Sequence, residues 1–196
     1  MMLTEIYNRL YSSSIVNQGV TDFKNCDKGS CHSYIPFYQT IFEGHREKED
    51  LNILEIGIQG GICLLLWEGF FRNARKIVGV DISLDMVQQK VFESAKINGK
   101  IHMVQHDATV PSVLNVLQDK YDIIIDDGSH QLSHQLGSFN LFKDRLNDGG
   151  IYIIEDIQNY SEAEFLRNSI SLSVIVDLRG VKGRYDDLLL MYKKGN

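Results

Sequence analysis

Short apolar runs alternate with amphipathic segments along the chain from about residue 51 onward. The segments between the runs carry apolar positions at helical spacing, most clearly at 84–98 and 133–146. Alternation of this kind predicts βαβ units, in which a mostly parallel sheet is covered by helices on both faces. The runs of strand length are 52–58, 76–82, 101–106, 121–126, 150–155, 172–177 and 188–192.

The connection between the last two runs predicts the direction of the final strand. It consists of 179–184, which is too short for a crossover helix, so the final pair should be antiparallel. We therefore predict an α/β fold, doubly wound and Rossmann-like, with a seven-stranded, mostly parallel sheet and an antiparallel last strand. One domain, 1–196, would comprise a helical and loop cap at 1–50 and the core at 51–196.

Composition and charge limit the class of partner. The chain has 196 residues and a formal net charge of -6, which argues against a nucleic-acid surface. No apolar stretch approaches the roughly 20 residues of a membrane span. The segment Met1–Tyr11 includes Glu5 and does not have the pattern of a signal peptide. These features predict a cytoplasmic protein with a small-molecule partner, and they are compatible with a homo-oligomer.

Three cysteines, Cys26, Cys31 and Cys63, show no framework spacing. An odd number without such spacing predicts ordinary reduced thiols, in keeping with a cytoplasmic location. Cys26 and Cys31 with His32 could be imagined as zinc ligands, but a second Cys/His pair that would complete the site is missing.

Two neighbouring apolar runs end in paired carboxylates. Asp126 and Asp127 end the fourth run, with His130 shortly after them, and Glu155 and Asp156 end the fifth. The carboxyl ends of parallel strands open onto one crevice, so up to four carboxylates are expected to converge there. Oxygen ligands in this number suit a divalent cation such as Mg²⁺. The adjacent histidine suits a general base.

A glycine-rich turn follows the first run. Glu55, Gly57 and Gly61 form the pattern E-x-G-x-x-x-G at the start of an apolar, helix-like segment. Glycines in such a turn let backbone N–H groups approach a ligand closely. Dinucleotide sites carry glycine at the first position, whereas a carboxylate there would repel a pyrophosphate. The pattern therefore favours a cationic ligand and disfavours a nucleotide-binding dehydrogenase.

The next two strand ends are also acidic. Asp81 ends the second run, at a position suited to accept hydrogen bonds from two ribose hydroxyls. Asp107 and Ala108 follow the third run, where they could contact an adenine edge. With the glycine turn, this combination resembles class I S-adenosylmethionine-dependent methyltransferases. The resemblance implies a cofactor-binding set of Glu55, Gly57, Gly61, Asp81, Ile82, Asp107, Ala108 and Asp126.

The second half sharpens the resemblance. Residues 28–160 look like the metal-dependent sugar O-methyltransferases of the mycinamicin type. The resemblance implies that Asp127, Glu155 and Asp156 bind Mg²⁺ or a similar divalent cation, and that His130 acts with Asp127 in catalysis as the general base. The acceptor would be a sugar-type molecule: a nucleotide sugar, a capsule sugar or an antibiotic glycoside. The matching motifs are Lys28-Gly29-Ser30 with His32 and Tyr34, the segment 52–61, the D-G-S-H of 127–130 and the E-D pair of 155–156.

Other interpretations of the same residues stay open. The chain could be a metal-independent small-molecule methyltransferase, or a non-catalytic module that binds a cofactor. Asp126 or Asp127 could cap the next helix or form an Asx turn. His134 should lie one helical turn from His130 on the same face, as a second contact or as an ordinary surface residue. The roles of His32 and Tyr34 in lining a cleft are likewise not fixed by the sequence.

Overall fold

The computed structural model describes residues 1–15 and 26–195, excluding the side chains of 12–15. In these parts of the chain, every helix is too short or too polar to cross a bilayer. The helices are α1 (Leu3–Ile15), α2 (Tyr34–Phe42), η2 (Glu43–His45), α3 (Ile62–Phe70), α4 (Gln89–Asn98), α5 (Val113–Val116), α6 (Leu132–Phe142), η3 (Lys143–Arg145), α7 (Tyr160–Ser169) and α8 (Arg179–Lys182). The strands are β1 (Asn52–Ile56), β2 (Lys76–Asp81), β3 (Ile101–Gln105), β4 (Tyr121–Asp126), β5 (Leu146–Ile154), β6 (Ser173–Asp177) and β7 (Leu188–Lys193).

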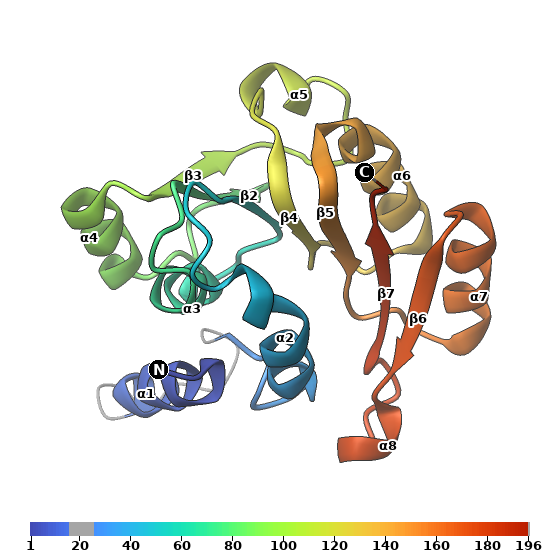
Figure 1. Cartoon of the computed structure of the whole chain (residues 1–196), viewed down its shortest axis with the longest axis horizontal. Coiled ribbons are helices and arrows are strands. Elements are labelled where there is room, and N and C mark those ends of the chain that lie inside the picture. Colours follow the sequence, from blue (N-terminus) through green and yellow to red (C-terminus); the bar gives the residue numbers. More distant parts are fainter. Residues whose placement is uncertain (16–25, 196) are drawn as a thin grey trace.

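The strands form one sheet in the order β3-β2-β1-β4-β5-β7-β6 (Figure 1). Neighbours from β3 to β5 are parallel, and β7 is antiparallel to both β5 and β6. The predicted seven-stranded fold with an antiparallel last strand is therefore confirmed. The short link before β7 contains only the single turn α8, which leaves no room for a crossover.

Alternate side chains of the central strands enter two separate cores. Ile53, Ile123 and Ile153 pack with residues of α1, α2 and α3. Leu54 and Ile124, the next residues on their strands, pack with residues of α6 and α7. Figure 1 shows these two groups of helices on either side of the sheet. This two-residue period also determines which strand-end side chains point to the same face.

The starts of one helix and one strand differ from the prediction. The segment 84–98 is helical only from Gln89, since the chain from Asp81 first forms bends and turns along the crevice. β5 starts at Leu146, so the glycine pair 149–150 lies within the strand. There the pairing with β4 jumps from Leu146 to Ile151, which marks an irregular stretch of the strand.

Cys26 and Cys63 form a disulfide, with their Cα atoms 5.0 Å apart. The prediction of reduced thiols was therefore wrong for these two residues, while Cys31 is free. The disulfide fastens the segment that precedes α2 to the first turn of α3. Their separation of 37 residues gives no sequence signal of pairing.

Reduction of this disulfide should lower the free energy of unfolding by about 2–4 kcal/mol, because a crosslink restricts the unfolded chain. Urea unfolding with and without dithiothreitol measures the change, and Cys63→Ser should reproduce it. Cys31→Ser is the matched control and should leave stability nearly unchanged. Three titratable thiols in the denatured, unreduced protein would show that the disulfide does not form.

Candidate active site

Two adjoining cavities lie at the carboxyl ends of β1, β2 and β4, with volumes of about 270 and 330 Å³. Gly57, Asp81 and Gly128 line both of them. The crevice is thus at the edge of the sheet where the sequence predicted it. We call the first, which is lined by Asp107 and Ala108 among others, the β2–β3 cavity. We call the second, which is lined by Asp127 and His130 among others, the His130 cavity.

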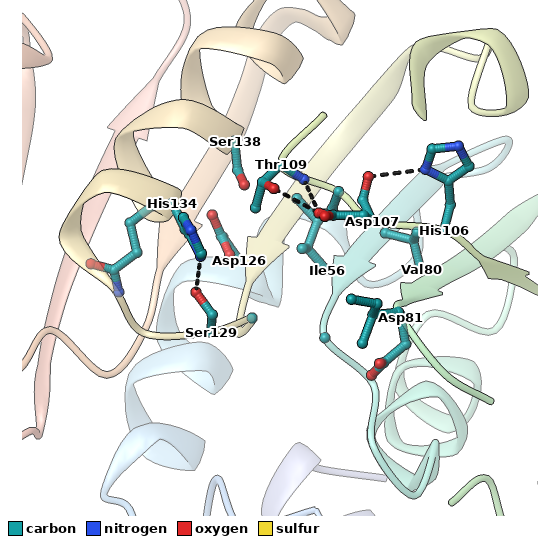
Figure 2. A pocket seen from close by; sticks show the side chains of 15 residues that line it. Ile56, Val80, Asp81, His106, Asp107, Thr109, Asp126, Ser129, His134 and Ser138 are labelled. Carbon is teal, nitrogen blue, oxygen red and sulfur yellow. Dashed lines mark hydrogen bonds between the residues drawn. The ribbon is translucent and has the colours of Figure 1, made fainter. Parts of the chain in front are cut away.

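The β2–β3 cavity contains most of the predicted cofactor residues (Figure 2). The Asp107 carboxylate accepts hydrogen bonds from the backbone N–H and hydroxyl of Thr109, which fix its orientation. Asp81 Oδ2 accepts from the N–H groups of Ile58 and Gln59, so Asp81 also holds the glycine turn. The predicted residues lining this cavity are Gly57, Asp81, Ile82, Asp107, Ala108 and Asp126.

Gly57 has a structural reason to be glycine. Its φ is +79°, and a Cβ there would lie 2.0 Å from the backbone oxygen of Asp127. The turn after β1 therefore packs directly on the backbone after β4. A side chain at this position would therefore force the two strand ends apart.

Glu55 and Gly61 are not among the described residues that line either cavity. Glu55 is fully buried behind the glycine turn, where its carboxylate accepts a hydrogen bond from Trp67 Nε1 at 3.0 Å. Burial raises the pKa of Glu55 to about 7, although the charge of Lys28 opposes this rise. Gly61 has a φ of +74° and immediately precedes α3.

The strand period separates the paired carboxylates that the sequence grouped together. Asp126 faces the side of α6, lines the β2–β3 cavity and accepts from the Tyr152 hydroxyl at 3.3 Å. Asp127 faces the opposite side and lines the His130 cavity. Burial raises the pKa of Asp126 to about 7. The four carboxylates that the sequence grouped together therefore do not all line the same cavity.

A buried lysine lies among the acids of that second face. Lys28 is fully buried, and its Nζ is 2.7 Å from Asp127 Oδ2 and 2.7 Å from Glu155 Oε2. Glu55 Oε1 lies 3.3 Å from the same nitrogen. Burial alone would lower the pKa of Lys28, but the surrounding carboxylates raise it well above its ordinary value. Reasoning from single motifs missed this role, and the Lys28-Gly29-Ser30 match was the only signal for it.

Asp127, His130 and Asp156 bring one ligand atom each to within 4.8 Å of one another. His130 Nε2 lies 3.2 Å from Asp127 Oδ1 and 3.6 Å from Asp156 Oδ2. Two carboxylates and an imidazole at this spacing are donors that suit a divalent cation. The predicted ligands Asp127 and Asp156 therefore fit such an ion, whereas Glu155 is turned away toward Lys28.

The surroundings shift the pKa values of Asp127, Asp156 and His130 in different ways. Burial alone would raise the pKa of Asp127, but the charge of Lys28 and the hydrogen bond with His130 hold it below its ordinary value. Burial raises the pKa of Asp156 to about 6, and the charge of Asp127 adds to this. Burial alone would lower the pKa of His130, yet the hydrogen bond and charge of Asp127 raise it to about 9.

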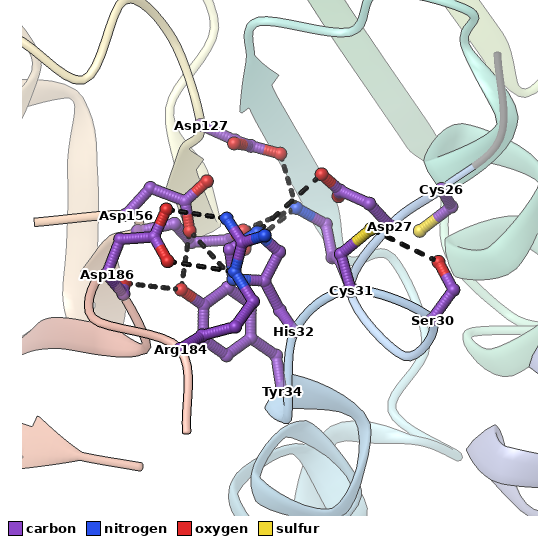
Figure 3. Close-up of polar contacts among 12 residues, drawn as sticks. Cys26, Asp27, Ser30, Cys31, His32, Tyr34, Asp127, Asp156, Arg184 and Asp186 are labelled. Carbon is purple, nitrogen blue, oxygen red and sulfur yellow. Dashed lines mark hydrogen bonds and ion pairs between the residues drawn. The ribbon is translucent and has the colours of Figure 1, made fainter. Parts of the chain in front are cut away.

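His32 and Tyr34 border this group (Figure 3). The Tyr34 hydroxyl donates to Asp156, and His32 Nδ1 lies 3.3 Å from the same carboxylate. His134 instead lines the β2–β3 cavity and bonds to the Ser129 hydroxyl. The expectation that it shares a face with His130 was wrong, because α6 begins only at Leu132 and His130 has a left-handed φ of 58°.

Comparison with known proteins bears on what such a crevice does. A family model described as a methyltransferase domain matches residues 54–157, which include the glycine turn and both acidic strand ends. The chain belongs to this methyltransferase family. The matched segment stops just beyond Asp156, so the family signal coincides with the crevice.

Among curated proteins, the chain is 33% identical over 142 residues to the 8-demethyl-8-alpha-L-rhamnosyl tetracenomycin-C 2'-O-methyltransferase of Streptomyces olivaceus, covering 67% of this chain and 35% of that protein. It is 34% identical over 139 residues to the demethylmacrocin O-methyltransferase of Streptomyces fradiae, covering 66% of this chain and 33% of that one. The chain thus spans about a third of the length of these relatives.

A solved structure of the MycE methyltransferase from the mycinamycin biosynthetic pathway, in complex with Mg, SAH and mycinamycin VI, aligns with a TM-score of 0.67. The alignment covers 100% of this chain and 55% of that one at 23% identity. At this identity the likeness shows a shared fold. It agrees with the class I methyltransferase fold described above.

Proposed function

We propose that this protein is an S-adenosylmethionine-dependent O-methyltransferase that acts on a sugar hydroxyl with the help of a divalent cation. The observation that carries the proposal is the group of Asp127, His130 and Asp156 beside the glycine turn. His130 and Asp127 line one end of the crevice, with the buried Asp156 3.6 Å from His130 Nε2, and Asp107 and Ala108 line the other end. The relatives with rhamnosyl and macrocin acceptors in their names support a glycoside as acceptor.

We expect the parts of the cofactor to follow the crevice in order. Asp81 would accept from the ribose hydroxyls, while Asp107 and Ala108 would border the adenine. The amino-acid end would extend past Gly57 into the His130 cavity. Glu55 lines neither cavity, and its carboxylate lies beside Lys28 and accepts from Trp67, so it would support the turn from behind without contacting the cofactor.

Methyl transfer to an alcohol is an in-line displacement that requires the hydroxyl to lose its proton. The neutral form of His130 would accept this proton, and Asp127 Oδ1 orients the imidazole from 3.2 Å. Burial alone would lower the pKa of His130, but Asp127 raises it to about 9, so the neutral form and the rate should increase with pH through that value. Asp127 and Asp156 would hold the divalent cation, which supplies a Lewis acid for neighbouring sugar hydroxyls when bound. Burial of Asp156 lowers the dielectric around it and strengthens its interaction with His130.

Two other functions are distinguished by simple measurements. A metal-independent methyltransferase would use the same cofactor residues and keep its activity in EDTA. A non-catalytic module would bind the cofactor but transfer no methyl group. The close contact of His130 with Asp127 and Asp156 favours a catalytic site over a non-catalytic module. Activity in EDTA separates the two catalytic alternatives.

A binding measurement tests the identity of the proposed cofactor. Calorimetry should detect micromolar affinity for S-adenosylmethionine and no comparable affinity for NAD. Asp81→Ala should weaken binding by about 1–3 kcal/mol, because the ribose hydroxyls and the N–H groups of Ile58 and Gln59 lose their acceptor. Asp85→Ala, an exposed position nearby, is the matched control. Tighter binding of NAD than of S-adenosylmethionine would overturn the assignment.

His130→Ala should reduce transfer of a labelled methyl group to a sugar acceptor by about 10²–10⁴-fold, the usual range for loss of a general base. Because hydroxide can replace the base, the variant should regain part of its rate as the pH rises. His102→Ala, at an exposed position on β3, should behave like the wild type. A flat pH profile with wild-type rate in His130→Ala would exclude this residue as the base.

A further inference from the structure

The Cys26–Cys63 disulfide lies in the wall of the His130 cavity. Both cysteines line this cavity together with Gly57 and His130. Their exposed fractions are only 5% and 8%, so the sulfur–sulfur bond is largely screened from bulk solvent. Cys26 also borders a hollow of about 10 Å³, whereas the His130 cavity measures about 330 Å³. The His130 cavity is therefore the route by which a small reductant reaches the bond.

The disulfide joins two segments that line the same cavity. Cys26 directly precedes Asp27, which lines the cavity as well. Cys63 is the second residue of α3 and follows the glycine turn of 57–61. A crosslink between these segments limits how far they can move apart. The width of the cavity between Asp27 and the glycine turn therefore depends on whether the disulfide is formed.

The position of Cys63 favours its release as a thiolate. The first turn of α3, a helix of nine residues, has backbone N–H groups without an intrahelical partner. Gly61 precedes the helix and has no side chain that could accept from them. Such a helix end stabilises a thiolate, and a stabilised thiolate leaves more readily in thiol–disulfide exchange. The bond is thus suited to reduction as well as to crosslinking.

A dithiol reductant would open the bond in two balanced steps. One thiolate of the reductant attacks the Cys26 sulfur, and the Cys63 sulfur leaves as a thiolate. The second thiol of the reductant then attacks the mixed disulfide and releases Cys26. Two electrons pass to the protein, the two thiol protons of the reductant end on the cysteines, and the reductant becomes a cyclic disulfide.

We infer that Cys26 and Cys63 form a redox-active pair whose disulfide form binds the cofactor more tightly than its dithiol form. This inference rests on the proposed function, because the amino-acid end of the cofactor would occupy the His130 cavity. The disulfide would hold the walls of that cavity at a fixed spacing, and bound cofactor would cover the sulfurs. Cofactor affinity and the reduction equilibrium are then coupled, and the two effects must be equal in size.

Calorimetry of the full chain with S-adenosylhomocysteine, the demethylated cofactor, tests the affinity with and without dithiothreitol. The reduced wild type should bind about tenfold more weakly, within the usual range of such couplings. Cys63→Ser should bind like the reduced wild type in both buffers, because it cannot form the pair. Cys31→Ser keeps the pair and is the matched control, so dithiothreitol should affect it as it affects the wild type. Fluorescence of Trp67, the single tryptophan, shows whether each form is folded.

The reciprocal measurement needs only the wild type, so it does not depend on how a variant folds. The protein is equilibrated in mixtures of reduced and oxidised dithiothreitol, and its free thiols are alkylated and counted by mass. Saturating S-adenosylhomocysteine should favour the disulfide by the same factor of about ten. For this two-electron couple, that factor lowers the midpoint potential by about 30 mV.

The outcomes separate the inference from the proposed function. Equal affinity of the oxidised and reduced forms, with an unchanged midpoint, would overturn the inference and leave a purely structural disulfide in a methyltransferase. Tighter binding by the reduced form would overturn it as well. No binding of S-adenosylhomocysteine to either form would overturn the proposed cofactor, and the inference with it.

Discussion

Asp127→Asn should reduce turnover by at least about 10³-fold while leaving cofactor affinity nearly intact. The substitution removes the anionic partner of His130 and one carboxylate of the divalent-cation site. General-base catalysis alone accounts for about 10²–10⁴-fold in rate, and the cation site is affected as well. Single-turnover transfer from labelled S-adenosylmethionine measures the rate, and calorimetry measures the affinity.

The variant also leaves Lys28 with a weaker partner in a buried site. Breaking a buried ion pair can cost about 3–5 kcal/mol, so unfolding of Asp127→Asn must be followed in parallel. Asp148→Asn is the control for charge alone. Wild-type turnover in a folded Asp127→Asn protein would contradict the assigned role.

Removal of divalent cations should stop methyl transfer, with a loss of about 10²-fold or more that added Mg²⁺ restores. Lewis-acid stabilisation of developing charge is worth several kcal/mol, and each 1.36 kcal/mol is about tenfold in rate. The measurement is initial rate in excess EDTA, followed by titration with Mg²⁺.

Calorimetry of S-adenosylmethionine binding in the same EDTA buffer is the companion control. Cofactor affinity should persist, since Asp81 and Asp107 lie in the β2–β3 cavity, away from Asp156. Full-rate transfer in EDTA would favour the metal-independent methyltransferase. Asp127 and Asp156 would then serve only to orient His130.

Periodicity in the sequence was sufficient for the fold. Apolar runs of strand length separated by helical segments predicted seven strands, and the short 179–184 link predicted the antiparallel partner. Such patterns are readable because burial on two faces requires continuous apolar strands and amphipathic helices. The acidic residues at the ends of β2 and β4 likewise indicated where the crevice lies, whereas Glu155 and Asp156, which follow β5, line neither cavity.

The sequence predicted only in part which of these acids share a cavity. The two-residue period of a strand separates Asp126 from Asp127, and this could have been deduced from alternation with the core isoleucines. Grouping the carboxylates by their proximity in sequence hid that signal. The position of His134 was mispredicted because no capping side chain marks the start of α6.

The sequence by itself determined the sheet, its last strand and the edge where the chemistry lies. Only the tertiary structure decided that Lys28 reaches Asp127 and Glu155, which are 99 and 127 positions away, and that Cys26 pairs with Cys63. Local patterns carry no information about such pairs, because the contacts exist only once the segment before α2 packs over the strand ends. The charge balance of the site therefore arises from folding as a whole.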